Sequence, residues 1–138
     1  FSPEVLAARA ALAAAPDARF SVYVGDIVAH PNDDAEWAAW HAGAAWLNTT
    51  LPVVPVVGNH EYTRRLGALS RTLSQRWRPQ FALPTYPDLP AALSETVYYL
   101  DYQGVRLVVL NGTAGLQPQA ARRALGALVG HGIADAFQ

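Results

Sequence analysis

Two apolar stretches that end in polar tips decide the fold: residues 53–61 read VVPVVGNHE, and residues 20–26 read FSVYVGD. Short runs of β-branched and aromatic residues are typical of β-strands, and the glycine after each run predicts a sharp turn. Between them, Asp33 or Asp34 can cap a helix whose apolar residues recur every three or four positions. We therefore predict a strand–helix–strand unit with two parallel strands.

The rest of the chain predicts further helices and a hairpin. Residues 97–102 and 105–110 read as two strands joined tightly near Gln103-Gly104, which is typical of an antiparallel hairpin. Apolar periodicity predicts helices over about 3–15, through Leu66, Leu69, Leu73 and Trp77, and over about 118–129. The expected class is α/β, with a mixed sheet in a single domain over residues 1–138.

Composition excludes several classes of protein. The 138 residues are 51% hydrophobic and 15% charged, which argues against disorder. The net charge of −1 indicates no broad attraction to nucleic acid, and no apolar run is long enough to span a membrane. The absence of Cys excludes disulfides, Cys-based zinc sites and thiol catalysis.

The two strand tips carry the chemistry. In open α/β sheets, ligands collect beyond the carboxyl ends of parallel strands, so Asp26 and Asn59 would offer hard oxygen ligands side by side, and His60 an imidazole. This donor set suits Mn²⁺, Fe²⁺ or Zn²⁺. Gly25-Asp26 alone is also an ordinary turn, and it is the pair of tips in one unit that favours a site.

These motifs resemble the calcineurin-like metallophosphoesterases, in the branch near the purple acid phosphatases. The matching residues are Val24-Gly25-Asp26 and 55–61, supported by the hairpin from Glu95 to Asn111. The resemblance implies a layered α/β-β/α domain, of which this chain would be a part. It also implies hydrolysis of a phosphate mono- or diester by a hydroxide that bridges two metal ions (Fe, Mn or Zn).

By that resemblance, Asp26 bridges both metals and Asn59 binds one of them. His60 faces the phosphate and helps to protonate the leaving oxygen, while Glu61 orients His60. Purple acid phosphatases carry a Tyr three residues after the aspartate, but this chain has Ala29 there, so an iron–tyrosinate site is not expected.

Two further residues are candidate substrate contacts with open alternatives. His30 follows the first tip and could line the pocket or be a solvated loop residue. Arg64 follows the second tip and could hold a phosphate oxygen or be a solvated charge.

Parts of the family pattern have no counterpart in this chain. Residues 1–19 hold no Asp-x-His, and Gly130-His131-Gly132-Ile133 lacks the second His of Gly-His-x-His. We interpret His131 as a histidine at a helix C-terminus. We expect a piece cut from a longer protein, whose missing strands leave apolar surface that promotes self-association. Alone, it should bind metal weakly and hydrolyse little.

Two other functions remain open. One is a non-catalytic metallophosphoesterase-like domain that binds a partner or carbohydrate. The other is a nucleotide-binding α/β domain, although no G-x-G-x-x-G or Walker sequence occurs. Relatives in this branch are often exported, so the resemblance leans toward an exported or periplasmic bacterial protein.

Overall fold

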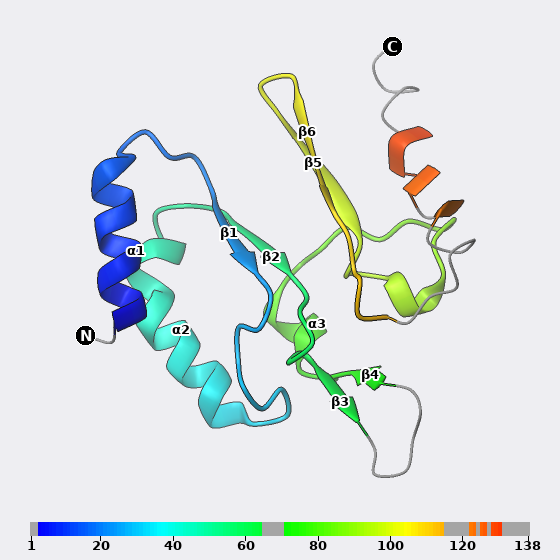
Figure 1. Cartoon of the computed structure of the whole chain (residues 1–138), viewed down its shortest axis with the longest axis horizontal. Coiled ribbons are helices and arrows are strands. Elements are labelled where there is room, and N and C mark those ends of the chain that lie inside the picture. The colour runs from blue at the N-terminus through cyan, green and yellow to red at the C-terminus, as the bar shows by residue number, and fades with distance from the viewer. Residues whose placement is uncertain (1–2, 65–70, 115–121, 124, 127, 131–138) are drawn as a thin grey trace.

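The computed structural model describes residues 3–64, 71–114, 122–123, 125–126 and 128–130. The chain combines helices with small sheets, as the predicted α/β class requires. Its elements, shown in Figure 1, are α1 (Pro3–Ala14), β1 (Ser21–Val24), α2 (Asp34–Asn48), β2 (Val53–Val56), β3 (Tyr62–Arg64), β4 (Arg71–Leu73), α3 (Trp77–Gln80), a 3₁₀ turn (Ala91–Leu93), β5 (Tyr98–Tyr102) and β6 (Val105–Val109).

The strand–helix–strand unit forms as predicted. β1 and β2 pair in parallel, with Val22 opposite Val54, and α2 connects them. The side chain of Asp33 accepts a hydrogen bond from the Ala35 N–H, so it caps one of the free amides at the start of α2. The predicted first helix is also confirmed and ends one residue early, at Ala14.

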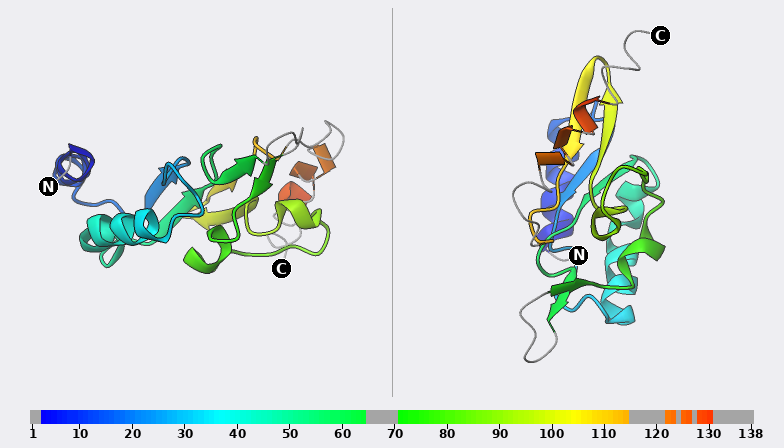
Figure 2. Two further views of the ribbon diagram at one scale, coloured as in Figure 1. Left: turned by 90° about the horizontal axis from the view of Figure 1, so that it is seen from below. Right: turned by 90° about the vertical axis from the view of Figure 1, so that its right-hand side faces the viewer.

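Different elements pack on the two faces of the β1–β2 pair. Tyr23 packs edge-on against Trp40 of α2, at 5.3 Å between ring centroids, and its hydroxyl lies 3.2 Å from Asn48 Oδ1. Val54 points to the other face, because side chains alternate along a strand, and there it packs with Tyr98 and Val109 of the hairpin. The views in Figures 1 and 2 accordingly place the helices α1 and α2 and the β5–β6 hairpin on opposite sides of the pair.

The predicted hairpin is confirmed, but the predicted mixed sheet is wrong. β5 and β6 are antiparallel, and the turn residues Gln103 and Gly104 both have positive φ, as a tight hairpin turn requires. The parallel pair and the two antiparallel pairs are nevertheless separate two-stranded sheets. Pro55 of β2 has no N–H to give a further strand, and its carbonyl oxygen accepts the Tyr98 hydroxyl at 2.7 Å. The hairpin therefore docks through side chains.

The helix predicted through Leu73 and Trp77 is also wrong. Residues 71–73 form β4, antiparallel to β3, with Leu73 opposite Tyr62. The Ser74 N–H then donates to the carbonyl of Glu61, and a short helix begins only at Trp77. Leu66 and Leu69 lie outside the described residues. The apolar spacing matched a helix, but Leu73 gains its burial as a strand residue beside Tyr62.

The last predicted helix is described only in part. Residues 122–123, 125–126 and 128–130 are helical, and Leu128 is fully buried with Leu93 and Val97. Residues 118–121, 124 and 127 of that prediction lie outside the described part of the chain.

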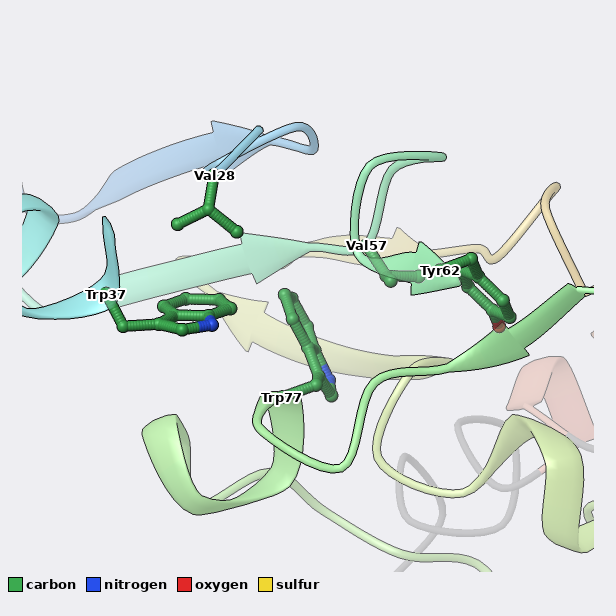
Figure 3. Packing of buried hydrophobic residues seen from close by; sticks show 5 residues of the cluster. All are labelled: Val28, Trp37, Val57, Tyr62 and Trp77. Carbon is green, nitrogen blue, oxygen red and sulfur yellow. The ribbon is translucent and has the colours of Figure 1, made fainter. Parts of the chain in front are cut away.

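A cluster of five buried side chains supports the strand tips: Val28, Trp37, Val57, Tyr62 and Trp77 (Figure 3). They come from the segment after β1, from α2, from the end of β2, from β3 and from α3. Trp77 is completely buried, and its indole N–H donates to the Glu95 carbonyl at 3.0 Å. Large aromatic surfaces with a satisfied polar atom supply much of the burial in a small core.

Part of the β1 surface is exposed. Val22 and Val24 lie on the same face as Val54, yet their side chains are 45% and 82% exposed. Self-association through this apolar strip stays a prediction. Within the residues that the structure describes, no helix is both long and apolar enough to span a membrane.

The docking of the hairpin through Tyr98 leads to a first prediction. Tyr98→Phe should lower the free energy of unfolding by about 1–2 kcal/mol, because the buried carbonyl of Pro55 loses its donor. Tyr102→Phe is the matched control, since that hydroxyl has no hydrogen bond with the described residues and the change should cost below about 0.5 kcal/mol. Urea denaturation of both variants measures this, and equal losses would contradict the docking contact.

Candidate functional site

The two strand tips touch through their glycines. Gly25 has a φ of +76°, and a Cβ on it would lie 2.7 Å from the Gly58 Cα. A Cβ on Gly58 would overlap Oδ1 of Asp26. The predicted sharp turn is confirmed at Gly25, whereas Gly58 is needed for the close approach of the two backbones and not for a positive φ.

The close approach brings Asp26 against the second strand tip, which carries Asn59 and His60. Asp26 has a φ of +52°, a left-handed conformation that Asp tolerates better than most residues. Its Oδ1 accepts the backbone N–H of His60 at 2.9 Å, which ties the first tip to the second. Oδ2 of Asp26 and the exposed side chain of Asn59 have no hydrogen bond with the described residues. Both side chains therefore have oxygen atoms available for a ligand.

Glu61 is fully buried and holds the tips together through main-chain amides. Its Oε2 accepts the N–H groups of Gly58 at 2.7 Å and Asp26 at 2.9 Å, and its Oε1 accepts the N–H of Ile27 at 2.6 Å. Hydrogen bonds to a carboxylate are stronger than those between neutral groups, and together they offset the cost of burying the charge.

The imidazole of His60 is oriented by a different group from the one the resemblance implies. Nδ1 lies 3.1 Å from the carbonyl oxygen of Ala29, so Nδ1 carries the hydrogen, because a carbonyl can only accept. The expected pairing of His60 with Glu61 is thus absent, since the Glu61 carboxylate is occupied by three amides. Nε2 of the exposed ring has no partner among the described residues.

A second carboxylate, which the sequence reasoning missed, holds the other half of the first loop. Glu36 Oε2 accepts the N–H groups of Ala29 and His30, each at 2.8 Å, and Oε1 lies 2.5 Å from Nδ1 of His30. The spacing Asp33-x-x-Glu36 resembles a capping box, which is the sequence signal that could have identified Glu36 as an acceptor of backbone N–H groups. Glu36 reaches back to the loop instead of to the cap residue.

The contact with Glu36 changes the titration of both groups. The hydrogen bond and the charge of Glu36 raise the pKa of His30 above its ordinary value of 6.5. Hydrogen bonds from the backbone and then from the ring of His30 lower the pKa of Glu36 below 4.5. His30, one of the two candidate substrate contacts, is therefore a partner of Glu36, although its side chain is 79% exposed.

The donor set is incomplete in the described part of the chain. Asp26 and Asn59 offer oxygen atoms of the type that Mn²⁺, Fe²⁺ or Zn²⁺ accepts. Among the described residues, no three His, Cys, Asp or Glu side chains come together to hold a metal ion. The Arg64 backbone lies in β3, but its side chain and His131 are outside the described part.

An apolar cavity lies beside the loop between β1 and α2. Its volume is about 380 Å³, and its walls are mostly apolar side chains of α1 and α2, with Trp40 and Trp46 as the largest. None of Asp26, Asn59 and His60 lines it. We therefore assign it no part in the candidate site.

No family model, curated protein or solved structure matches this chain. The candidate site is defined by its geometry: two tips in backbone contact, oxygen atoms of Asp26 and Asn59 without partners among the described residues, and an oriented imidazole.

The buried carboxylate leads to a second prediction. Glu61→Gln should lower the free energy of unfolding by about 2–4 kcal/mol, because an amide NH₂ must face at least one of the three N–H donors. Glu95→Gln is the matched control: its carboxylate forms one partly exposed ion pair with Arg78, worth below about 1 kcal/mol. Chemical denaturation measures both. A Glu61 variant as stable as the control would show that the amides need no carboxylate.

The His30–Glu36 pair leads to a third prediction. The raised pKa of His30 stabilises the fold below pH 6.5 and loses this effect as the pH rises through the folded pKa. The lowered pKa of Glu36 stabilises above pH 4.5 and loses its effect as the pH falls through the folded value. The pair should therefore stabilise most between these two ordinary values.

An NMR titration of the His30 ring protons tests this coupling. The midpoint should lie above 6.5 in the unchanged chain and fall toward 6.5 in Glu36→Gln. A midpoint that Glu36→Gln leaves in place would contradict the pairing.

Proposed function

We propose that this chain carries part of a dinuclear metallophosphoesterase site and that the protein to which the site belongs hydrolyses phosphate mono- or diesters. One observation supports this most: Asp26, Asn59 and His60 lie on two touching strand tips, with free oxygen atoms and a free Nε2. The proposed fold is a partial version of the layered α/β-β/α domain, to which α2, the parallel pair and the hairpin would belong.

Asp26 and Asn59 would contribute to holding the metal ions. Their oxygens are exposed and fit hard or borderline divalent ions, while the remaining ligands would come from outside the described residues. Two bound ions supply Lewis-acid activation of water and of the phosphoryl oxygen. The Glu61 carboxylate fixes the backbone on which both ligands stand, so it acts as a positioning residue.

His60 would act on the phosphate ester itself. The Ala29 carbonyl keeps the hydrogen on Nδ1, so Nε2 is the atom that can take up a second proton and donate it. A protonated imidazole at this position can stabilise charge on a phosphoryl oxygen and protonate the leaving oxygen. The substrate would therefore approach the exposed Nε2 edge of the ring.

A non-catalytic binding domain is the second candidate. It is favoured by the donor count, because the described residues place no group of three His, Cys, Asp or Glu together. The two hypotheses differ in one property. A phosphoesterase requires metal affinity at Asp26 and Asn59, whereas a non-catalytic binding domain does not.

The fourth prediction concerns the broadening of NMR signals by paramagnetic Mn²⁺, which distinguishes the two hypotheses. In an NMR titration of the whole chain, the amide signals around Asp26 and Asn59 should broaden first, at a low affinity that reflects the incomplete donor set. Asp26→Asn should remove this broadening, whereas Asp17→Asn, an exposed carboxylate in the turn after α1, should leave it unchanged.

Hydrolysis of p-nitrophenyl phosphate by the same samples should be low. If Asp17→Asn reduces the broadening as much as Asp26→Asn does, the result would contradict the proposed site and favour the binding domain. Strong Mn²⁺-dependent hydrolysis that Asp26→Asn abolishes would show that the described residues need no further ligands, contrary to our account.

A further inference from the structure

A smaller cavity is lined in part by residues of the β3–β4 pair. Its volume is about 240 Å³, and two arginines, Arg71 and Arg78, share its wall with Tyr62. None of Asp26, Asn59 and His60 lines it. The remaining walls are mainly apolar and include Leu73, Ala92 and Ala114.

The cavity wall carries positive charge that is only partly neutralised. Nε of Arg78 lies 2.8 Å from Oε2 of Glu95, but one carboxylate cannot occupy all five N–H donors of a guanidinium. The Arg71 side chain is exposed and forms no hydrogen bond or ion pair with any described residue. The two arginines and one carboxylate leave a net positive charge beside the cavity.

Tyr62, which lines the same cavity, carries an O–H proton without a partner among the described residues. Its side chain is 91% buried, and its hydroxyl accepts a hydrogen bond from Asn111 Nδ2 at 2.7 Å. Asn111 also donates to the Thr96 hydroxyl, and Thr96 donates to the Leu93 carbonyl at 3.0 Å. The Tyr62 hydroxyl donates to no described residue, so its proton has no acceptor among them.

A buried O–H without an acceptor is costly, and native structures rarely leave one unexplained. Burial also raises the pKa of Tyr62, so the hydroxyl keeps this proton at neutral pH. An oxyanion in the cavity would accept the Tyr62 proton and the N–H groups of both arginines. Hydrogen bonds in which the acceptor is ionised are the stronger kind.

We propose that this cavity binds the oxyanion group, phosphate or carboxylate, of a small organic molecule. The volume is below the roughly 300–1,000 Å³ of most small-molecule sites, so the cavity takes a head group with a small apolar part and not a large ligand. The proposal is independent of the phosphoesterase function, because Asp26, Asn59 and His60 take no part in it.

Titration of the whole, metal-free chain with three benzene-ring probes tests the proposal by NMR. Phenyl phosphate and benzoate carry the two oxyanions, and benzyl alcohol is an uncharged probe of similar size. At least one of the anions should shift signals of Tyr62, Arg71 and Arg78 more than benzyl alcohol does. The anion that binds with the higher affinity identifies the head group as phosphate or carboxylate.

Two variants and one control locate the binding. Arg71→Gln, at an exposed position, should weaken anion binding about tenfold, because a charged hydrogen-bond donor is lost. Tyr62→Phe keeps the buried ring and should weaken it about three- to tenfold. Arg19→Gln removes an exposed arginine that does not line the cavity and should change nothing.

Three results would overturn the proposal. They are binding of benzyl alcohol as tight as that of the anions, no shift at the cavity residues with either anion, and equal weakening by Arg71→Gln and Arg19→Gln. Binding lost in both Arg71→Gln and Tyr62→Phe, with Arg19→Gln unchanged, supports it whether or not Mn²⁺ binds at Asp26.

Discussion

The buried carboxylate of Glu61 is the interaction on which the rest of the candidate site depends. It accepts amides from both strand tips, Gly58 on one side and Asp26 and Ile27 on the other. The tips are in backbone contact, at a separation that leaves no space for a Cβ on either Gly25 or Gly58. Several N–H donors must converge there, and a single anion satisfies three of them.

The geometry of the candidate site follows from this arrangement. Once the tips are joined, the N–H of His60 reaches Asp26, and the ring of His60 reaches the carbonyl of Ala29. Glu36 holds the amides of Ala29 and His30 from α2, so two carboxylates secure the ends of one short loop. Asp26, Asn59 and His60 are exposed to solvent, while Glu61 and Glu36 hold the backbone of the two tips.

Local patterns predicted the β1–α2–β2 unit, the hairpin and the sharp turn at Gly25, because strand runs, caps and turn glycines act over a few residues. Longer-range choices escaped prediction. The spacing of Leu73 fits a helix, but its pairing with Tyr62 is decided by packing. The strands form separate pairs, and Pro55 has no N–H to offer a further strand at β2. No motif shows which amides Glu61 reaches or that Asn111 lies against Tyr62, 49 residues away.

Hydrogen exchange of three backbone amides tests the central role of Glu61 most directly. We predict that the N–H groups of Asp26, Ile27 and Gly58 exchange slowly although they lie in turns at the edge of the sheet, because each is bonded to a buried carboxylate. The exposed amide of Gly112 provides the internal reference for fast exchange. If the three amides exchange as fast as that of Gly112, Glu61 does not hold the strand tips together, and the role that we assign to its carboxylate is contradicted.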